Sequence, residues 1–400
     1  MNWTDPTTLT VTCGRGCAGA LRRELAALGH PEARDFTPTA VGVEGDLREA
    51  LKLNLWLRSA NRVLFEVAAF RVRTPDELYA AATTLPWEEW LAPGAPFHLH
   101  GDAEAPGLRD PRFALLRCKD AIADRFVRKT GARPDSQSDP DGAACIALHW
   151  RDGVARLHLD TSGVPLSRRG YRLRPWIAPL RESLAAAILL ESGWDPAEDA
   201  FAGPMCGSGT LAIEAAWMAM RRAPGLRRES YAFQRLRDWP ADAWRGLLDA
   251  ARRRCLPLPA VPIAASDVDS RAVEIARDNA DRAGVARHIA FGVADFRRAP
   301  VPRAPGLVAM NPEYGERMGL EERLAPLYAA IGDDLKTRCA GLRAAVISGN
   351  PELAKRIGLR PSRRIPMWNG PIECRLLLYD LYVGTRDPRL IRKHAGGDDA

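Results

Sequence analysis

A loop with two glycines stands where an apolar segment is predicted to run from a strand into a helix. Residues 203–210 read Gly-Pro-Met-Cys-Gly-Ser-Gly-Thr. Glycine permits a tight turn and lets the backbone approach a ligand without Cβ contacts, although a Gly-x-Gly is also typical of a plain turn. The Gly-Lys-Ser/Thr ending of a P-loop is missing. The candidate ligand-binding residues of this loop are Pro204, Met205, Cys206, Gly207, Ser208 and Gly209.

Carboxylates follow the next two predicted strands. Asp267 and Asp269 end the first of these strands, and Asp295 follows the second. An acidic residue after such a strand can accept hydrogen bonds from ribose hydroxyls, whereas one that opens a helix serves as its N-cap. We assign ribose binding to Asp267 and capping to Asp269 with Ser270. Asp295 is predicted to face an adenine amine, and a solvated loop carboxylate is equally compatible with its position.

The motif Asn311-Pro312-Glu313-Tyr314 follows a further predicted strand. The fixed backbone angle of Pro312 orients its own carbonyl and the Asn311 side chain, which together offer two acceptors to one planar amino group. Tyr314 offers a ring face on which a base can stack. Taken alone, this motif is also typical of an Asn-Pro turn.

The order of these four features is more specific than any one of them. Each is predicted to stand at the carboxyl end of a strand, where ligands of open α/β sheets bind. A glycine loop, a ribose carboxylate, an adenine carboxylate and an Asn-Pro-x-Tyr motif together indicate S-adenosylmethionine binding and methylation of an exocyclic amine. We expect Asn311, Pro312 and Tyr314 to be the catalytic residues.

The elements that must position these loops alternate between strand and helix from about residue 161 onward. Hydrophobic periodicity predicts strands over residues 201–205, 262–266, 290–293, 307–310 and 343–347, with helices over 181–192, 211–220 and 271–283. Such alternation predicts an α/β fold with a parallel, doubly wound sheet. The first 160 residues are predicted to be α+β, with strands over 9–13, 62–70, 144–150 and 154–160 and helices over 18–28, 51–57 and 113–128. Val41, Val43 and Leu47 indicate a further strand and turn.

Composition sets the wider limits. A length of 400 residues predicts two or three domains, and 46% hydrophobic with 27% charged residues is typical of globular proteins. No apolar run reaches the ~18 residues of a membrane span, and no secretion signal opens the chain, so we expect a cytoplasmic protein. Neither the Cys13 and Cys17 pair nor the His98 and His100 pair has the further ligands that a metal site needs, so no metal is expected.

The net positive charge favours a nucleic-acid partner, whereas the high arginine content is also typical of a GC-rich genome. The formal net charge is +7, and arginine can bond two phosphate oxygens at once. No feature of the sequence predicts an oligomeric state. The candidate RNA-binding residues are Arg117 and Lys119 in a predicted helix, and Arg168, Arg169, Arg172 and Arg174 in the connector over residues 167–174.

Seven segments carry a resemblance that extends from about residue 9 to about residue 384. The chain resembles the RlmL-type bacterial methyltransferases, which modify the 2-amino group of guanosine in large-subunit ribosomal RNA and have an N-terminal THUMP domain. The matching segments are 116–124 (LRCKDAIAD), 169–172 (RGYR), 178–185 (APLRESLA), 204–211 (PMCGSGTL), 222–226 (RAPGL), 314–317 (YGER) and 369–374 (NGPIEC).

The resemblance implies the domain organisation. We expect a ferredoxin-like segment over residues 1–60, a THUMP RNA-binding domain over 61–162, a Rossmann-like class I methyltransferase domain over 163–385 and a polar tail over 386–400. It also implies S-adenosylmethionine as the cofactor and RNA as the partner. Ribosomal RNA is favoured over tRNA, on which related THUMP proteins act.

Two positions depart from the family pattern. Gly203 replaces an Asp that resembles the carboxylate facing the methionine amine of the cofactor, and Glu313 replaces the second Pro of Asn-Pro-Pro-Tyr. Loss of one charge-assisted bond costs ~1.5–3 kcal/mol, or roughly ten- to hundredfold in affinity. One hypothesis is that Glu313 contacts the cofactor's ammonium and compensates for Gly203. The other is that the chain is a catalytically silent RNA-binding or assembly factor.

Overall fold

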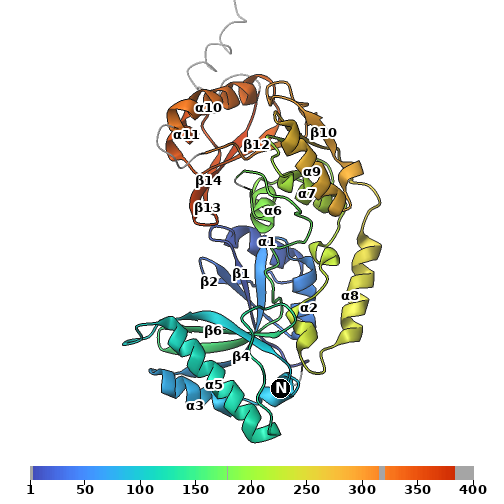
Figure 1. Cartoon of the computed structure of the whole chain (residues 1–400). Helices are drawn as coiled ribbons and strands as arrows, with labels where there is room; N and C mark the ends of the chain where they lie inside the picture. The colour runs from blue at the N-terminus through green and yellow to red at the C-terminus, as the bar shows by residue number, and fades with distance from the viewer. Residues whose placement is uncertain (1–2, 178, 315–319, 383–400) are drawn as a thin grey trace, which may run out of the picture. The chain divides into compact units, whose positions relative to one another are not determined.

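The computed structural model describes residues 3–177, 179–314 and 320–382, and the chain divides into two compact units (Figure 1). The first unit contains the chain up to Gly170 together with Arg222–Cys255, and the second contains Tyr171–Arg221 and the chain from Leu256. The expected polar tail over residues 386–400, and residues 315–317 and 178 of the matching segments, lie outside the described residues.

We expected the segment Arg222–Cys255 to belong to the methyltransferase domain. It packs in the first unit instead. The Arg228 guanidinium donates to the carbonyls of Ser162, Val164 and Pro165. The Trp3 indole donates to the Arg237 carbonyl over 3.0 Å. Hydrogen bonds between residues far apart in sequence therefore hold Arg222–Cys255 in the first unit. No local sequence pattern predicts these hydrogen bonds.

The first unit is built on a seven-stranded sheet with the order β2-β3-β1-β4-β7-β6-β5. Only the β5–β6 pair is parallel. The central strand β4 pairs with β1 on one side and with β7 on the other, so it belongs to both halves of the sheet. The strands are β1 (Thr7–Cys13), β2 (Arg34–Thr37), β3 (Ala40–Gly45), β4 (Ala60–Arg71), β5 (Phe97–Ala103), β6 (Ala144–Arg151) and β7 (Val154–Asp160).

Helices of the first unit pack on this sheet, and Figure 1 shows α3 and α5 side by side. The helix expected over residues 51–57 begins earlier, at Leu47, which we expected in a strand and turn. The Asp46 side chain caps this helix, α2, by accepting from the Glu49 N–H. The helices are α1 (Ala18–Ala27), α2 (Leu47–Trp56), α3 (Pro75–Thr84), α4 (Trp87–Trp90), α5 (Pro111–Thr130) and α8 (Ala241–Arg254), with 3₁₀ turns η1 (Pro224–Arg227) and η2 (Ala232–Arg235).

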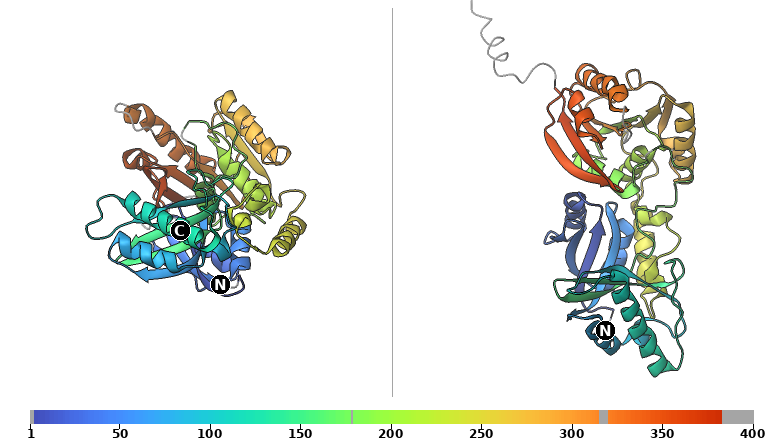
Figure 2. Two further views of the ribbon diagram at one scale, coloured as in Figure 1. Left: turned by 60° about the horizontal axis from the view of Figure 1, so that its bottom comes forward. Right: turned by 60° about the vertical axis from the view of Figure 1, so that its left-hand side comes forward.

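The second unit contains a seven-stranded sheet with the order β10-β9-β8-β11-β12-β14-β13. The first five strands are parallel, which confirms the predicted parallel sheet, and β14 runs antiparallel to both of its neighbours. The β13–β14 hairpin at the sheet edge was not predicted (Figure 2). The strands are β8 (Ala200–Pro204), β9 (Ile263–Asp267), β10 (Ala290–Val293), β11 (Gly306–Met310), β12 (Arg343–Ser348), β13 (Arg363–Asn369) and β14 (Ile372–Asp380).

The strand order places a topological switch point between β8 and β11. From β8 the chain moves outward to β9 and β10, and then returns to β11 on the other side of β8. Tyr328, Ile331 and Leu335 of α10 pack with β11 and β12 in a buried apolar cluster. The helices are α6 (Glu182–Glu191), α7 (Thr210–Ala219), α9 (Ser270–Arg282), α10 (Leu320–Thr337) and α11 (Pro351–Arg356), with a 3₁₀ turn η3 (Ala286–His288).

Within the described part of the chain, no helix combines the length and the apolar character that crossing a membrane requires. Within the same residues, no three His, Cys, Asp or Glu side chains gather where they could hold a metal ion.

Candidate functional site

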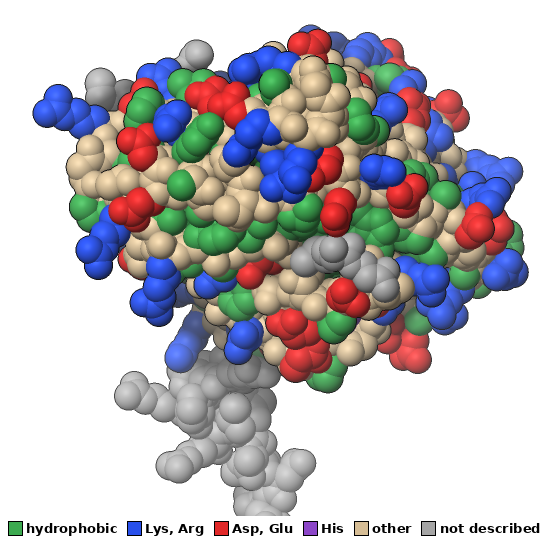
Figure 3. Space-filling model, turned by 90° about the horizontal axis from the view of Figure 1, so that it is seen from below, with side chains coloured by type: hydrophobic (Ala, Val, Ile, Leu, Met, Phe, Trp, Pro, Cys, Tyr) green, Lys and Arg blue, Asp and Glu red, His purple; other side chains and the backbone are tan. Residues whose placement is uncertain are grey.

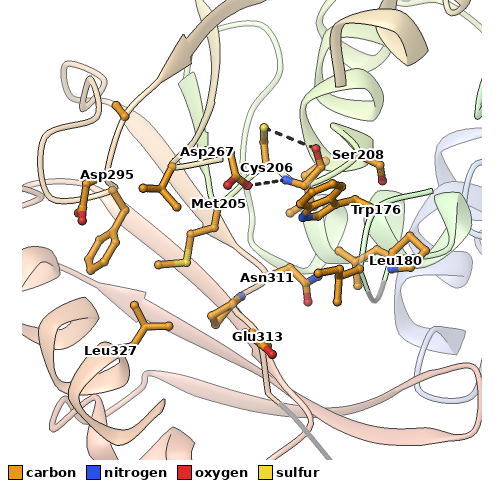
Figure 4. A pocket seen from close by; sticks show the side chains of 18 of the residues that line it. Trp176, Leu180, Met205, Cys206, Ser208, Asp267, Asp295, Asn311, Glu313 and Leu327 are labelled. Atoms are coloured by element: carbon orange, nitrogen blue, oxygen red, sulfur yellow. Dashed lines mark hydrogen bonds between the residues drawn. The ribbon is translucent and has the colours of Figure 1, made fainter. Parts of the chain in front are cut away.

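A cavity of about 490 Å³ opens at the carboxyl ends of β8, β9, β10 and β11 (Figure 4). This volume lies within the range of small-molecule sites, and the location agrees with the rule that ligands bind at the switch point of an open α/β sheet. All four loops singled out in the sequence contribute to its lining. The tertiary structure therefore brings together segments that are more than a hundred residues apart.

The loop after β8 has the backbone conformation of a close-approach turn. Met205, Gly207 and Gly209 have positive φ angles of 59°, 52° and 80°, a region that glycine enters without the cost a side chain adds. A Cβ on Gly209 would lie 2.9 Å from the Cβ of Ala276 on α9. Glycine is therefore required there by both φ and space.

The predicted loop residues divide into two groups. Met205, Cys206, Gly207 and Ser208 line the cavity; Pro204 and Gly209 stand at the two ends of the loop, outside the lining. Burial raises the pKa of the Cys206 thiol to about 12, so the thiol stays protonated and is no nucleophile at neutral pH.

Asp267 connects β9 to the glycine loop. Its Oδ2 accepts from the Gly207 N–H over 3.0 Å and its Oδ1 from the Asp269 N–H over 3.1 Å. A carboxylate has about four acceptor positions, so two remain for a ligand's hydroxyls. The capping assigned to Asp269 is confirmed, because its side chain accepts from the Arg271 N–H at the start of α9.

Asp295 lines the cavity and is paired with Arg297 two residues later. Asp295 Oδ1 accepts from both the backbone N–H and the Nε of Arg297 over 2.9 Å. The hydrogen bond to this guanidinium lowers the pKa of Asp295 to about 2. The carboxylate is therefore ionised at neutral pH and able to accept from an amine as well.

Asn311, Pro312 and Glu313 line the cavity from the loop after β11. Figure 4 shows the Asn311 and Glu313 side chains on the side of the cavity opposite Asp267. The Glu313 side chain is 47% exposed, and its Oε1 lies 3.5 Å from Nη2 of Arg323 on α10. The Tyr328 hydroxyl donates to the Glu313 carbonyl over 3.2 Å, which fixes the backbone of this loop.

Tyr314 does not present the open ring face that we expected. It is buried, with 5% of its surface exposed, and is not among the residues that line the cavity. Its hydroxyl accepts from Asn369 Nδ2 over 3.1 Å, and its ring lies where a Cβ on Gly349 would come within 2.6 Å. Tyr314 thus anchors the end of the motif to β13.

Gly203 also lies outside the lining. It is a buried residue of β8, and a Cβ there would lie 3.2 Å from the Phe201 ring. Replacing it with Asp therefore requires this buried ring to move. Compensation by Glu313 stays a hypothesis: its carboxylate lines the cavity and lies 3.5 Å from the Arg323 guanidinium.

Sequence reasoning missed several residues of the site. Val268 and Phe296 each follow one of the two cavity carboxylates and line the cavity with apolar surface, as do Trp176 and Leu327. The sequence could have indicated Val268 and Phe296, because each directly follows a carboxylate that was assigned to the site. No local pattern marks Asn279, a fully buried α9 residue whose Nδ2 donates to the Ser208 carbonyl over 3.0 Å.

Two of the five candidate RNA-binding arginines have partners in the protein interior. Arg169 is buried and donates to the carbonyls of Leu166 and Arg58, and Arg172 donates to the Leu180 carbonyl and to Thr210 Oγ1. These two guanidinium groups form hydrogen bonds within the protein rather than face solvent.

The other candidates are more open. Arg174 pairs with Glu274 and Asp278, and Arg117 pairs with Asp76 and lies over the Tyr79 ring. Lys119 is half-buried and Arg168 is exposed. On the face shown in Figure 3, basic side chains are interspersed with acidic and hydrophobic ones rather than gathered in one patch.

Among known proteins, three family models match consecutive parts of the chain. The RlmL ferredoxin-like domain matches residues 8–64, the THUMP domain residues 72–146, and the RMKL-like methyltransferase domain residues 169–377. The ribosomal RNA large subunit methyltransferase K/L of Syntrophotalea carbinolica is 40% identical over 386 residues, which are 94% of this chain and 54% of the relative. The chain spans about half the length of the curated relatives it matches.

Solved structures match almost the whole chain. SMU.472, crystallised in complex with SAH, superposes with a TM-score of 0.84 and 26% identity over 96% of this chain and 100% of that chain. A methylase from Listeria monocytogenes, with N6-adenine in DNA as its predicted target, has a TM-score of 0.83 and 29% identity over 94% of this chain and 96% of its own. Since the methyltransferase model matches more than half of its residues, the chain belongs to the RMKL-like methyltransferase-domain family.

Proposed function

We propose that this protein transfers a methyl group from S-adenosylmethionine to the exocyclic 2-amino group of a guanosine in RNA, with large-subunit ribosomal RNA as the preferred substrate. The main support for this proposal is that one cavity is lined by the glycine loop, Asp267, Asp295 and the Asn311-Pro312 pair. The names of the relatives support the ribosomal substrate, and the THUMP match over residues 72–146 supports an RNA partner.

The cavity has groups suited to each part of the cofactor. The backbone of residues 205–208 forms a close-approach turn for the amino-acid end, Asp267 retains acceptor capacity for the ribose hydroxyls, and Asp295 retains it for the adenine amine. Val268 and Phe296 provide apolar walls beside the two carboxylates. The crystal structure of SMU.472 with SAH, the demethylated form of the same cofactor, supports this assignment.

The amine is held by acceptors of this chain. When bound, S-adenosylmethionine supplies an electrophilic methyl group, so the protein must orient the amine's lone pair rather than provide a strong base. The Asn311 side chain and the Pro312 carbonyl accept the two amine hydrogens. The buried Tyr314 acts as a positioning residue, and the target base must leave its stack to enter the cavity.

Basic side chains that are at least partly accessible to solvent provide the RNA contacts in this proposal. Arg168 and Lys119 remain candidates, with Arg117 and Arg174 contributing if their exposed carboxylate partners are exchanged for phosphates. Such an exchange is inexpensive, because exposed ion pairs contribute only about 0–1 kcal/mol.

The second candidate function is that of a silent RNA-binding protein, and Gly203 is the observation that favours it. The family pattern has a carboxylate there, whereas here the Phe201 ring occupies the adjacent space. Titration with S-adenosylmethionine separates the two functions, because a silent protein retains RNA binding but not cofactor binding.

The test compares the wild-type chain with Asn311→Ala in methyl transfer to ribosomal RNA and to tRNA from a strain lacking the gene. We expect the wild type to methylate guanosine in ribosomal RNA. Asn311→Ala should lose at least a hundredfold in rate while its cofactor dissociation constant stays within about threefold, since Asn311 faces the amine. Wild-type turnover by Asn311→Ala would remove the catalytic assignment, and modification of tRNA alone would replace the substrate.

A further inference from the structure

The exocyclic amines of nucleic-acid bases differ in the ring atom next to them. In adenine and cytosine the amine is beside a ring nitrogen with a lone pair, which accepts a hydrogen bond. In guanine the neighbour of the 2-amino group on the Watson–Crick edge is N1–H, which donates one, and the lone pair of N3 lies on the other side of the amine. A protein that reads the Watson–Crick edge of an unstacked base can therefore select guanine with one acceptor next to the amine site.

Glu313 provides such an acceptor. It follows Asn311 and Pro312 in the same loop, it lines the same cavity, and about half of its side-chain surface is accessible. Its backbone is held by the hydroxyl of Tyr328, a fully buried residue that also hydrogen-bonds Ser348 Oγ over 3.0 Å. The carboxylate is therefore attached to a fixed strand end beside the amine acceptors.

The contact with Arg323 leaves this carboxylate available. Arg323 is 66% exposed and approaches Glu313 Oε1 at 3.5 Å, the distance of a loose ion pair. A carboxylate offers about four acceptor positions, so one such contact leaves room for a ring N–H. A base with a lone pair in place of N1–H would instead face the carboxylate oxygens without a proton between them.

We infer that Glu313 is the residue that selects guanine, by accepting a hydrogen bond from N1–H while Asn311 and Pro312 hold the adjacent 2-amino group. The inference rests on the proposed function and adds to it the side chain that reads the base. It also gives a role to a carboxylate at a position where the family pattern has proline.

The experiment uses the full chain and an RNA that the wild type methylates, with the target guanosine either retained or replaced by 2-aminopurine. 2-Aminopurine keeps the 2-amino group but has a bare N1. We expect the wild type to prefer guanosine at least a hundredfold in kcat/KM. In Glu313→Gln this preference should fall at least tenfold, because the amide can donate to the bare N1.

A second variant and a matched control complete the design. Glu313→Ala should lower kcat/KM for guanosine at least tenfold and leave that for 2-aminopurine within about threefold. Glu352→Gln changes an exposed glutamate that pairs with Lys355 outside the cavity, and its base preference should equal that of the wild type. 2-Aminopurine also lacks the 6-oxygen, but this difference is common to all the proteins and cancels when their preferences are compared.

The outcomes separate this inference from the proposed function. A wild type that binds S-adenosylmethionine but methylates no guanosine overturns both. A wild type that methylates guanosine, with an unchanged preference in Glu313→Gln, overturns the inference alone. Unchanged preference together with a tenfold weaker cofactor affinity would instead place Glu313 against the cofactor.

Discussion

Gly209 is a residue at which backbone conformation and available space impose the same choice. Its φ is 80°, it is the N-cap of α7, and a Cβ would lie 2.9 Å from Ala276. Gly203, in contrast, has no positive φ and lies in a regular strand. The two glycines of one loop region therefore have different physical reasons to be there.

We predict that Gly209→Ala destabilises the second unit by about 1–3 kcal/mol, the cost of a strained φ together with a steric overlap. It should also weaken S-adenosylmethionine binding, since the loop must shift. Thermal unfolding and a cofactor titration measure the two effects. The matched control is Gly292→Ala on β10, where φ is not in the positive region and no atom lies within 4 Å of the added Cβ. Equal unfolding temperatures for the two variants would contradict the prediction.

At the scale of elements, one buried amide of α9 contacts the glycine loop that lines the cavity. Asn279 Oδ1 accepts from the Leu173 N–H over 2.8 Å, while its Nδ2 donates to the carbonyls of Ser208 and Arg174. The helix thereby fixes both the glycine loop and the segment that leads to α6. A polar side chain with no exposed surface is retained because all its hydrogen bonds are satisfied at once.

Asn279→Ala should therefore reduce stability by about 2–4 kcal/mol and weaken cofactor binding about tenfold, because two segments of the site lose a common partner. The control is Asp278→Ala on the same helix, which removes only an exposed ion pair with Arg174 and should cost less than about 1 kcal/mol. Calorimetric titration of both variants with S-adenosylmethionine provides the comparison. An Asn279→Ala protein with wild-type affinity would show that the amide does not position the loop.

The strand β7 contains a buried histidine whose charge state depends on folding. His158 is 1% exposed, and burial, followed by the nearby His149, lowers its pKa to about 3 from an ordinary 6.5. Glu66 Oε2 lies 3.7 Å from its Nε2. The folded state keeps this imidazole neutral at pH values at which the unfolded chain binds a proton.

The first unit should therefore lose stability as the pH falls through 6.5 toward 3, by up to about 1.4 kcal/mol per pH unit from this residue. Above pH 6.5 both states are neutral and the contribution is constant. In His158→Gln the corresponding slope should be absent. Urea unfolding at pH 7, 6 and 5, followed by a probe in the first unit, measures the difference. Parallel pH profiles of the two proteins would contradict the assignment.

At the scale of the whole molecule, RNA binding and cofactor binding are expected to respond differently to salt. The net charge is +7, and each phosphate contact releases counterions when it forms. Because Arg222–Cys255 packs in the first unit, a fragment that ends at residue 160 lacks part of its own fold. The full chain is thus the appropriate material.

We expect the RNA affinity of the full chain to fall about a hundredfold between 50 and 200 mM salt, as a handful of phosphate contacts requires. S-adenosylmethionine affinity, determined mainly by hydrogen bonds within the cavity, should change less than about threefold. Fluorescence anisotropy with a labelled ribosomal RNA fragment and calorimetry with the cofactor provide the two measurements. RNA binding that is indifferent to salt would count against a phosphate-gripping role for the basic residues.

The four loops that meet at the cavity, and their order along the chain, could be predicted from the sequence. Some features depend only on residues close together in the chain, namely the strand–helix alternation, the glycine loop and the Asp269 cap. Their patterns can therefore be recognised without knowledge of the fold. The parallel sheet follows from the same alternation, and with it the expectation that the four loops share one edge. The hairpin of β13 and β14 was not predicted, because strands at the end of a sheet obtain their order from pairing rather than from local pattern.

Which of the candidate side chains line the cavity depends on tertiary packing. Tyr314 is turned into the protein by Asn369, and Arg169 by the carbonyl of Arg58, more than a hundred residues away. The Phe201 ring limits the space for a side chain at position 203, and Arg323 of α10 lies 3.5 Å from the Glu313 carboxylate. Burial and hydrogen-bond partners depend on residues that are distant in sequence. A motif therefore identifies candidate residues, and the packing around them determines which of their side chains line the cavity.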